Sequence, residues 1–343
     1  MQKIKVEDSW KFYFEDRGLP LETTEKYVSY IKALTSKNLP IIFELEHLSQ
    51  LVGIKSDEVL KMVNAPEKFY RNFSIPKRKG GKREIHSPYP SLMLCQQWIY
   101  QNILLSQGIH SCAHGFAPGK SIVSNAKPHL NKKALLKMDL VNFFPSIPIA
   151  WVLNFFSALG YAHNVSYYLA SLCCLNGFLA QGASTSPYLS NILLFSLDNR
   201  LNKLARAYDL DYTRYADDLI FSGSYIPHNF ISIVEKIIEK YGLSPNREKT
   251  RLHTNPGQRI VTGVSVSGEN LALPRSSKRE IKKEFHYIRK HGYLSHIAKR
   301  KIKDPFYLDV VQGKIAFWLQ IEPNDNFARN AFNYIKELKL SAN

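Results

Sequence analysis

The chain has 343 residues, 45% of them hydrophobic and 12% aromatic, which is enough to bury a sizeable core in two or three subdomains. Its formal net charge is +17, and a protein this basic usually has a polyanionic partner, above all a nucleic acid. Apolar runs of the roughly 20 residues that span a membrane are absent, the chain start lacks a signal core, and the 4 cysteines lack metal-binding spacing. We therefore expect a cytoplasmic protein with reduced cysteines and no membrane partner.

The first 65 residues are typical of a helical segment. Thr24 is a candidate N-cap for a helix over residues 25–34, and Ser56 is a candidate N-cap for a helix over residues 57–63. We therefore expect a small helical extension ahead of the first strands.

A basic hairpin is predicted next. Residues 73–76 and 83–86 form its strands, and Gly80-Gly81 provides the turn. The interval Arg71–Arg83 holds 6 basic residues and no acidic one, and the later interval Arg275–Lys303 holds 11 basic residues against 2 acidic ones. Both intervals are interleaved with aromatic residues, which is typical of surfaces that follow a phosphate backbone.

Three acidic residues lie at the ends of predicted strands in the middle of the chain. An apolar strand over residues 135–138 ends at Asp139, and the pair Asp217-Asp218 separates an aromatic strand from an aliphatic one. Adjacent carboxylates repel each other unless a cation lies between them, and a carboxylate that ends an apolar strand is costly unless it is paired or metal-bound. A divalent metal is the natural candidate, although an acid such as Asp218 is also common in an ordinary turn.

Three further segments follow a recognisable order around these acids. Gln181-Gly182 followed by Ser186-Pro187 predicts a tight turn that leads into a helix. Gly242–Thr250 predicts a turn-rich connection, and Ile260–Val264 predicts a strand.

In this order the segments resemble the reverse transcriptase family. Five blocks of that family have counterparts here, namely Asp139, residues 181–187, Tyr215–Asp218, Gly242–Thr250 and the primer-gripping strand Ile260–Val264. The resemblance implies an α+β right-hand polymerase with fingers, a palm made of an antiparallel sheet plus helices, and a helical thumb. The implied division is an N-terminal helical extension (1–65), fingers (66–90 and 150–184), palm (91–149 and 185–265) and thumb (266–343).

The resemblance also implies an RNA-directed DNA polymerase that uses dNTPs and two Mg²⁺ ions, for which Mn²⁺ is a possible substitute. The implied metal ligands are Asp139, Asp217, Asp218 and the carbonyl group of Leu140. Hard divalent cations prefer such oxygen ligands, and two of them stabilise the attacking and leaving oxygens of phosphoryl displacement.

A set of nucleotide-binding residues follows from the same resemblance. Its members are Lys77 and Arg83 for the triphosphate, Phe144 as a barrier to a 2′-hydroxyl, Gln181 near the sugar and template base, and Lys249 as a proton donor to pyrophosphate. Lys79 competes with Lys77, because the register of the hairpin is open. A surface lysine in a turn is an equally consistent interpretation of Lys249.

Two short signatures are similar to those of bacterial retron enzymes, and they define the predicted RNA-binding residues. The first is Asn125 with His129 in an Asn-Ala-x-x-His pattern, and the second is Val261-Thr262-Gly263. Pro128 argues against one regular helix through the first signature. Retron enzymes imply a cognate structured non-coding RNA, priming from an internal RNA 2′-hydroxyl, and branched multicopy single-stranded DNA (msDNA). They also imply a separate effector protein and antiviral defence; the oligomeric state is left open.

Two alternatives remain at this stage. One is a group II intron-like or other defence-associated reverse transcriptase, and the other is a non-catalytic RNA-binding scaffold. The three acids Asp139, Asp217 and Asp218 argue against the scaffold, which has no need of metal-binding carboxylates.

Overall fold

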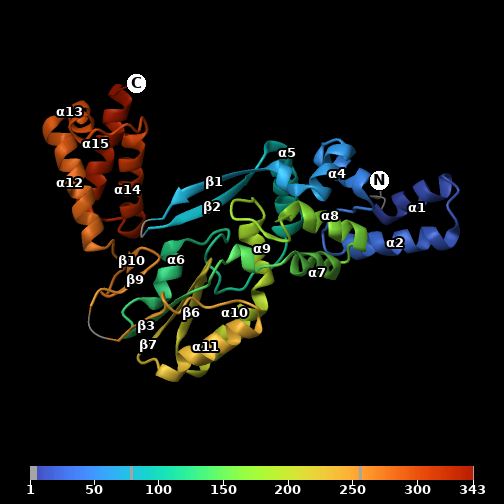
Figure 1. Ribbon diagram of the computed structural model, residues 1–343, viewed down its shortest axis with the longest axis horizontal. Helices are drawn as coiled ribbons and strands as arrows, with labels where there is room; N and C mark the ends of the chain where they lie inside the picture. Colours follow the sequence, from blue (N-terminus) through green and yellow to red (C-terminus); the bar gives the residue numbers. More distant parts are fainter. Residues whose placement is uncertain (1–5, 78–79, 255–256, 343) are drawn as a thin grey trace, which may run out of the picture. The chain divides into compact units, whose positions relative to one another are not determined.

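The computed structural model describes residues 6–77, 80–254 and 257–342, with the side chains of 341 and 342 excepted (Figure 1). Contacts within the chain divide it into two compact units, which are described separately. The first unit comprises Met1–Ser111, Val141–Asn199 and Ile238–Ser244, and the second comprises Cys112–Leu140, Arg200–Ile237 and Pro245–Asn343.

The first unit is mainly helical. Its elements are α1 (Val6–Asp16), α2 (Leu21–Thr35), α3 (Leu45–Val52), α4 (Ser56–Asn64), α5 (Pro90–Ile99), α7 (Ile149–Leu159), α8 (His163–Cys173), α9 (Ser186–Leu193) and the short strands β4 (Cys174–Leu175) and β5 (Phe178–Leu179). The predicted caps in its N-terminal part were wrong. Helix α2 starts at Leu21, so that Thr24 lies inside it with a fully buried side chain, and α4 has Lys55 rather than Ser56 at its N-cap position.

The basic hairpin is confirmed and also belongs to the first unit. Strands β1 (Tyr70–Pro76) and β2 (Lys82–Pro88) pair antiparallel, with Pro76 opposite Lys82. Both turn glycines, Gly80 and Gly81, have positive φ, at 90° and 81°. Such angles are strained for residues with a Cβ atom, which explains the glycine pair.

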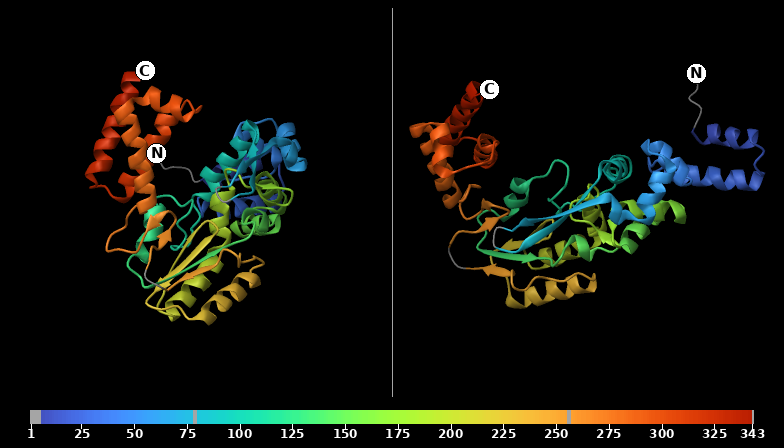
Figure 2. Two further views of the ribbon diagram at one scale, coloured as in Figure 1. Left: turned by 60° about the vertical axis from the view of Figure 1, so that its left-hand side comes forward. Right: turned by 45° about the horizontal axis from the view of Figure 1, so that its top comes forward.

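The second unit is built on a four-stranded antiparallel sheet. Its order is β6-β7-β3-β8, with β6 at Asp211–Tyr215, β7 at Asp218–Gly223, β3 at Ala134–Asp139 and β8 at Arg251–His253. Helix α11 (His228–Lys240) lies along one face of the sheet in Figures 1 and 2. There the rings of Phe230 and Phe221 pack with their centroids 5.1 Å apart. Helix α10 (Phe195–Ala207) runs from the first unit into the second.

A helical bundle completes the second unit, as Figure 1 shows in orange and red. It consists of α12 (Arg275–His291), α13 (Tyr293–Arg300), α14 (Tyr307–Ile321) and α15 (Asn326–Ala342). Its core surrounds the fully buried Trp318 and continues into the sheet region through Val261, Val264 and Leu135. This continuity anchors the bundle to the strands that precede it.

The predicted strand over residues 260–264 is a hairpin instead. Strands β9 (Ile260–Val261) and β10 (Val264–Ser265) pair across a turn at Thr262 and Gly263, whose φ angles are 45° and 85°. No helix among the described residues is long and apolar enough to cross a membrane.

Candidate active site

The three predicted acids come together at one end of the sheet. Asp139 ends β3 and lies opposite Asp218, the first residue of β7, in the antiparallel register. Asp217 lies in the turn between β6 and β7, and its carbonyl group accepts a hydrogen bond from the Leu140 backbone N–H at 3.1 Å. The predicted metal ligands of the second unit are therefore adjacent in the fold, although they are separated by more than seventy residues of sequence.

A buried arginine supports the turn that carries Asp217. Ala216 has a φ of 56°, in the left-handed region that favours glycine. The guanidinium group of Arg214 is fully buried, and its Nη1 donates a hydrogen bond to the Ala216 carbonyl at 3.1 Å. Sequence reasoning missed Arg214, because an arginine in a strand is usually a surface residue.

The carboxylates of the site repel one another. Burial, together with the neighbouring charges of Asp217 and Asp139, raises the pKa of Asp218 to about 6, while Lys137 and Lys249 oppose this shift. The largest cause is burial, which disfavours the charged carboxylate, and repulsion between the acids adds to it.

Lys249 partly offsets this repulsion. Its ammonium group lies 2.8 Å and 3.0 Å from the two carboxylate oxygens of Asp139, and this contact raises the pKa of Lys249. Asn246 contacts the same residue, donating from its backbone N–H to the Asp139 carbonyl at 2.7 Å. Lys249 is an exposed lysine whose ammonium group pairs with Asp139, and its role at pyrophosphate stays a prediction.

The donor set suits a hard divalent cation. Within the described residues, no three His, Cys, Asp or Glu side chains are arranged closely enough to hold a metal as they stand. Even so, the site offers carboxylate oxygens, the ligands that Mg²⁺ prefers. The raised pKa of Asp218 and the ammonium group on Asp139 both indicate that a cation would be stabilised here.

The predicted nucleotide-binding residues, apart from Lys249, belong to the first unit. The Gln181 carbonyl accepts a hydrogen bond from the His86 N–H of the basic hairpin at 2.8 Å, so that the second sequence block lies against the hairpin. Arg83 and Lys77 are exposed on that hairpin, whereas Lys79 lies outside the described residues. Phe144 starts a short 3-10 turn, half-buried beside Phe143.

A glycine keeps Gln181 close to the hairpin. Gly182 has a φ of 124°, and a Cβ atom there would lie 2.6 Å from the His86 carbonyl oxygen. Backbone oxygens cannot yield as flexible side chains can, so that only glycine fits this close approach.

Asn125 and His129, two of the predicted RNA-binding residues, do not face solvent, and their contact with RNA stays a prediction. Both side chains are fully buried. The His129 ring lies 2.7 Å from the hydroxyl oxygens of both Ser222 and Thr213, and burial lowers its pKa to about 4. These residues therefore support β6 and β7, the two strands joined by the turn that carries Asp217 (the acidic turn).

The two signatures meet inside the second unit. The Asn125 amide donates a hydrogen bond to the Thr262 hydroxyl at 3.3 Å. Val261 is buried, while Gly263 is exposed at the tip of the β9–β10 hairpin. Of the five predicted RNA-binding residues, Thr262 and Gly263 alone have solvent-facing surface in the described structure.

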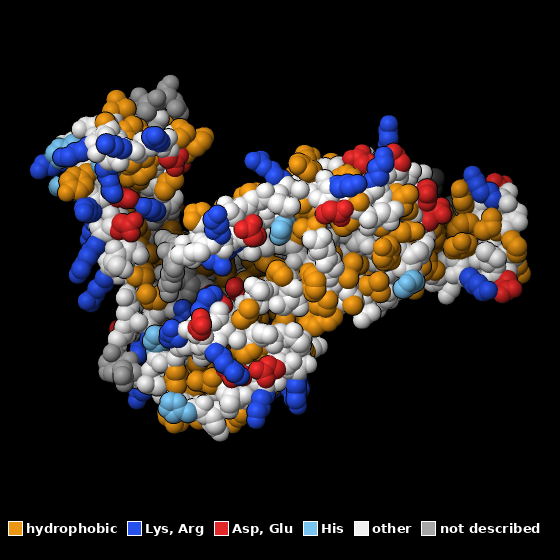
Figure 3. Space-filling model, in the orientation of Figure 1, with side chains coloured by type: hydrophobic (Ala, Val, Ile, Leu, Met, Phe, Trp, Pro, Cys, Tyr) orange, Lys and Arg blue, Asp and Glu red, His pale blue; other side chains and the backbone are white. Residues whose placement is uncertain are grey.

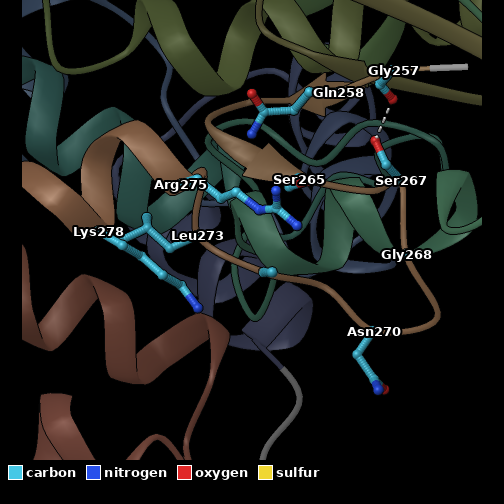
Figure 4. Close-up of a pocket in the computed structure, with 10 residues that line it drawn as sticks. Gly257, Gln258, Ser265, Ser267, Gly268, Asn270, Leu273, Arg275 and Lys278 are labelled. Atoms are coloured by element: carbon cyan, nitrogen blue, oxygen red, sulfur yellow. Dashed lines mark hydrogen bonds between the residues drawn. The ribbon is translucent and has the colours of Figure 1, made fainter.

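A cavity of about 580 Å³ lies beside this hairpin, at the start of α12 (Figure 4). The Ser267 hydroxyl donates to the Gly257 carbonyl at 3.0 Å and fixes one wall. The polar side chains that line the cavity are those of Gln258, Ser265, Ser267, Asn270, Arg275 and Lys278. Amide, hydroxyl and cationic groups of this kind suit a sugar–phosphate backbone.

Comparisons with known proteins agree with this geometry. The sequence model of the family described as reverse transcriptase (RNA-dependent DNA polymerase) matches residues 75–303. The retron Ec86 reverse transcriptase of Escherichia coli is 30% identical over 92% of this chain and 96% of its own length. The retron Mx65 reverse transcriptase of Myxococcus xanthus is 38% identical over 63% of this chain, but that match spans only 55% of the relative.

Among solved structures, a telomerase from Candida albicans in complex with a telomeric RNA fragment aligns with 78% of this chain and 63% of its own. The identity is 13% and the TM-score 0.42, a likeness too remote to support any conclusion about this chain. The family match over residues 75–303 includes Asp139, Asp217 and Asp218, and the Escherichia coli relative covers most of the chain. The chain belongs to the reverse transcriptase family of RNA-dependent DNA polymerases, and it is of the bacterial retron type.

Proposed function

We propose that this protein copies a cognate structured non-coding RNA into DNA, starting from the 2′-hydroxyl of an internal guanosine and leaving a branched RNA–DNA product, msDNA. The observation that carries the proposal is the convergence of Asp139, Asp217 and Asp218 at one end of the antiparallel sheet. Membership of the retron-type reverse transcriptases supports the substrate and the product.

The acids would hold two Mg²⁺ ions, with the Leu140 carbonyl as a further ligand and Mn²⁺ as a substitute. When bound, such ions stabilise charge on the attacking and leaving oxygens. The chain itself contributes the positions of the ligands. Arg214 fixes the turn that presents Asp217, and the strand pairing fixes Asp139 against Asp218. The protonated ammonium group of Lys249, which pairs with Asp139, would donate a proton to the leaving pyrophosphate.

The nucleotide-binding roles are part of the proposal. Arg83 and Lys77 would hold the triphosphate, because an exposed arginine and lysine on a two-stranded hairpin can reach phosphate oxygens. Phe144 would exclude a 2′-hydroxyl, and Gln181 would contact the sugar and template base. The hydrogen bond between the Gln181 carbonyl and His86 supports a common role for the second block and the hairpin.

The RNA would lie along the basic surfaces of the second unit. Figure 3 shows Lys and Arg side chains gathered over the helical bundle. The tip at Thr262 and Gly263 and the polar side chains of the adjoining cavity would offer further contacts to the sugar–phosphate backbone. The division of the chain into an N-terminal extension, fingers, palm and thumb, as predicted from the sequence, is also part of the proposed function.

Membership of the retron-type reverse transcriptases also supports a proposal about the biological setting. The proposed setting includes a separate effector protein, a role in antiviral defence and a cytoplasmic location. The positive charge suits a partner made of RNA rather than a membrane.

Sequencing of the nucleic acid that copurifies with the protein from its native host tests this function. The expected result is a branched molecule in which DNA is joined to the 2′-oxygen of an internal RNA guanosine. Linear host RNA, or DNA with an ordinary 5′ end, would contradict retron-type priming and favour a group II intron-like enzyme. RNA that carries no copied DNA at all would favour a non-catalytic scaffold.

A further inference from the structure

The loop of residues 112–121 is an additional edge of the hairpin that carries the acidic turn. The Arg214 backbone N–H donates to the Cys112 carbonyl at 2.8 Å, and the His114 N–H donates to the Arg214 carbonyl at 2.8 Å. Between them, Ala113 and Arg214 form a short parallel bridge. This loop is therefore held in register with β6.

A glycine allows the loop to touch the acidic turn itself. A Cβ atom at Gly115 would lie 2.6 Å from the backbone nitrogen of Ala216 and 3.2 Å from the Tyr215 carbonyl carbon. Backbone atoms on both sides would have to move to make room for it. The loop thus approaches as closely as two backbones can, directly beside the residue that precedes Asp217.

The next residue, Phe116, has a large side chain at a backbone position that does not suit it. Phe116 has a φ of 60°, in the left-handed region where a bulky side chain is strained and Gly or Asn is favoured. Its ring is not part of the core, because 44% of the residue is exposed. Hydrophobic burial therefore does not explain why a strained position carries a large aromatic side chain.

The Phe116 ring lies beside Tyr215, an aromatic residue of the β6–β7 hairpin. Its centroid is 6.3 Å from that of Tyr215, and the rings are tilted by 42°. Tyr215 precedes Asp217 by two residues and pairs with Asp218. The Tyr215 ring, with Phe116 beside it, therefore lies next to the turn at which a 3′ end would react.

We propose that Phe116 and Tyr215 form an aromatic contact surface for the terminal base pair of the RNA–DNA hybrid, and that Phe116 positions the growing 3′ end. Aromatic rings bind the faces and edges of nucleotides without regard to sequence, as a polymerase requires. Gly115 sets how closely the ring approaches the acidic turn. The inference rests on the proposed polymerase function and adds a contact to it.

The change Phe116→Asn tests the inference, because asparagine suits the backbone angle but has no ring. The dissociation rate of an annealed DNA primer–RNA template and the KM for it should each rise about tenfold. The kcat at saturating primer–template should change much less, and the melting temperature should stay equal or rise. Phe116→Tyr should restore wild-type binding, and Tyr225→Asn, which removes another exposed aromatic ring from the same unit, should have no effect.

Two results would overturn the inference. One is unchanged dissociation of the primer–template from the Phe116→Asn variant. The other is a fall in melting temperature and kcat with unchanged KM, which would show that the ring only packs the loop. Fluorescence anisotropy of the bound primer–template measures dissociation without turnover. If the wild-type protein binds the primer–template but does not extend the primer, the polymerase function is refuted. The comparison of dissociation rates between wild type and Phe116→Asn still tests the role of Phe116.

Discussion

At the scale of single residues, the active site is defined by uncompensated negative charge. Asp218 is buried next to Asp217 and opposite Asp139, and together these effects raise its pKa to about 6. The ammonium group of Lys249 neutralises Asp139 but not the whole cluster. A site arranged in this way stabilises cations, because each added positive charge relieves repulsion that the fold has already imposed.

Stability without metal should depend on pH through Asp218. Its pKa in the folded state is above the usual 3.8, so that folding favours the protonated form. The cost of the ionised form is fully present above pH 6 and is relieved as the pH falls from about 6 towards 4. In EDTA, Asp218→Asn should therefore raise the unfolding free energy at pH 7.5 by on the order of 2 kcal/mol, with little gain near pH 4. A gain independent of pH, measured by urea unfolding, would refute this.

The choice of sugar tests Phe144. The change Phe144→Val removes the ring and should lower the ratio of kcat/KM for dGTP over GTP by about tenfold or more, since shape selection of this kind is worth roughly 1–3 kcal/mol. Phe178→Val, which shortens another aromatic side chain of the same unit, serves as the control. Unchanged discrimination in a folded Phe144 variant would make it a packing residue.

At the scale of elements, the sequence predicted the strands that carry chemistry. The strand before Asp139 was confirmed from its short apolar run, and the hairpin around Asp217 from its aromatic and β-branched runs on either side of a turn. The hairpin at Gly80-Gly81 was confirmed for the same reason. The hairpin at Thr262-Gly263 was missed, because β-branched residues such as threonine prefer strands. Thr262 instead has a φ of 45°, which is a turn conformation.

Tertiary packing accounts for the other differences. The retron signature identifies Asn125 and His129 by residue type. It does not show on which side of the sheet their side chains lie. Thr24 suits an N-cap, yet its helix extends a turn further and buries it. Arg214 has no local signal, because its role depends on a turn two residues later.

A buried support role predicts the behaviour of His129. His129→Leu should lower the unfolding free energy by about 1–3 kcal/mol, because it leaves the hydroxyls of Ser222 and Thr213 without their partner. Self-primed DNA synthesis and extension of a supplied primer should then fall together, in proportion to the folded fraction. The exposed His228→Leu is the control and should stay within about 0.5 kcal/mol of wild type. Selective loss of self-primed synthesis by a fully stable variant would contradict the support role.

The pH dependence of His129 follows from the same burial. Its pKa in the folded state is about 4, below the usual 6.5, so that folding favours the neutral ring. Its contribution is complete above pH 6.5 and is lost as the pH falls towards 4. Wild-type stability should therefore fall more steeply than that of His129→Leu over this interval in urea unfolding. Parallel curves would show that folding leaves the pKa of this ring unchanged.

At the scale of the whole molecule, the charge of +17 is concentrated in part on the helical bundle. Helix α12 exposes a series of cations on the side away from its apolar core, among them Arg279, Lys283 and Arg289. Such a surface binds phosphates mainly by releasing counterions, so that salt weakens it strongly.

Salt titration measures this surface. Replacing Arg279, Lys283 and Arg289 by Ala should weaken RNA binding and reduce the slope of log K against log salt by about 2–3, at up to 0.9 for each phosphate contact. A matched triple change of exposed lysines on the N-terminal helices, Lys26, Lys55 and Lys61, should leave the slope unchanged. Equal slopes for both triple variants would place the RNA elsewhere.

The central claim is that the acids at the end of the sheet catalyse RNA-directed DNA synthesis. Its most direct test is Mg²⁺-dependent dNTP incorporation on an RNA template by purified wild type and Asp217→Asn, with RNA affinity measured in parallel. We predict incorporation by the wild type, its loss by at least about a thousandfold in the variant, and RNA affinity within about twofold, because one metal ligand is lost while the basic surfaces stay intact. Incorporation by Asp217→Asn at the wild-type rate would contradict the account.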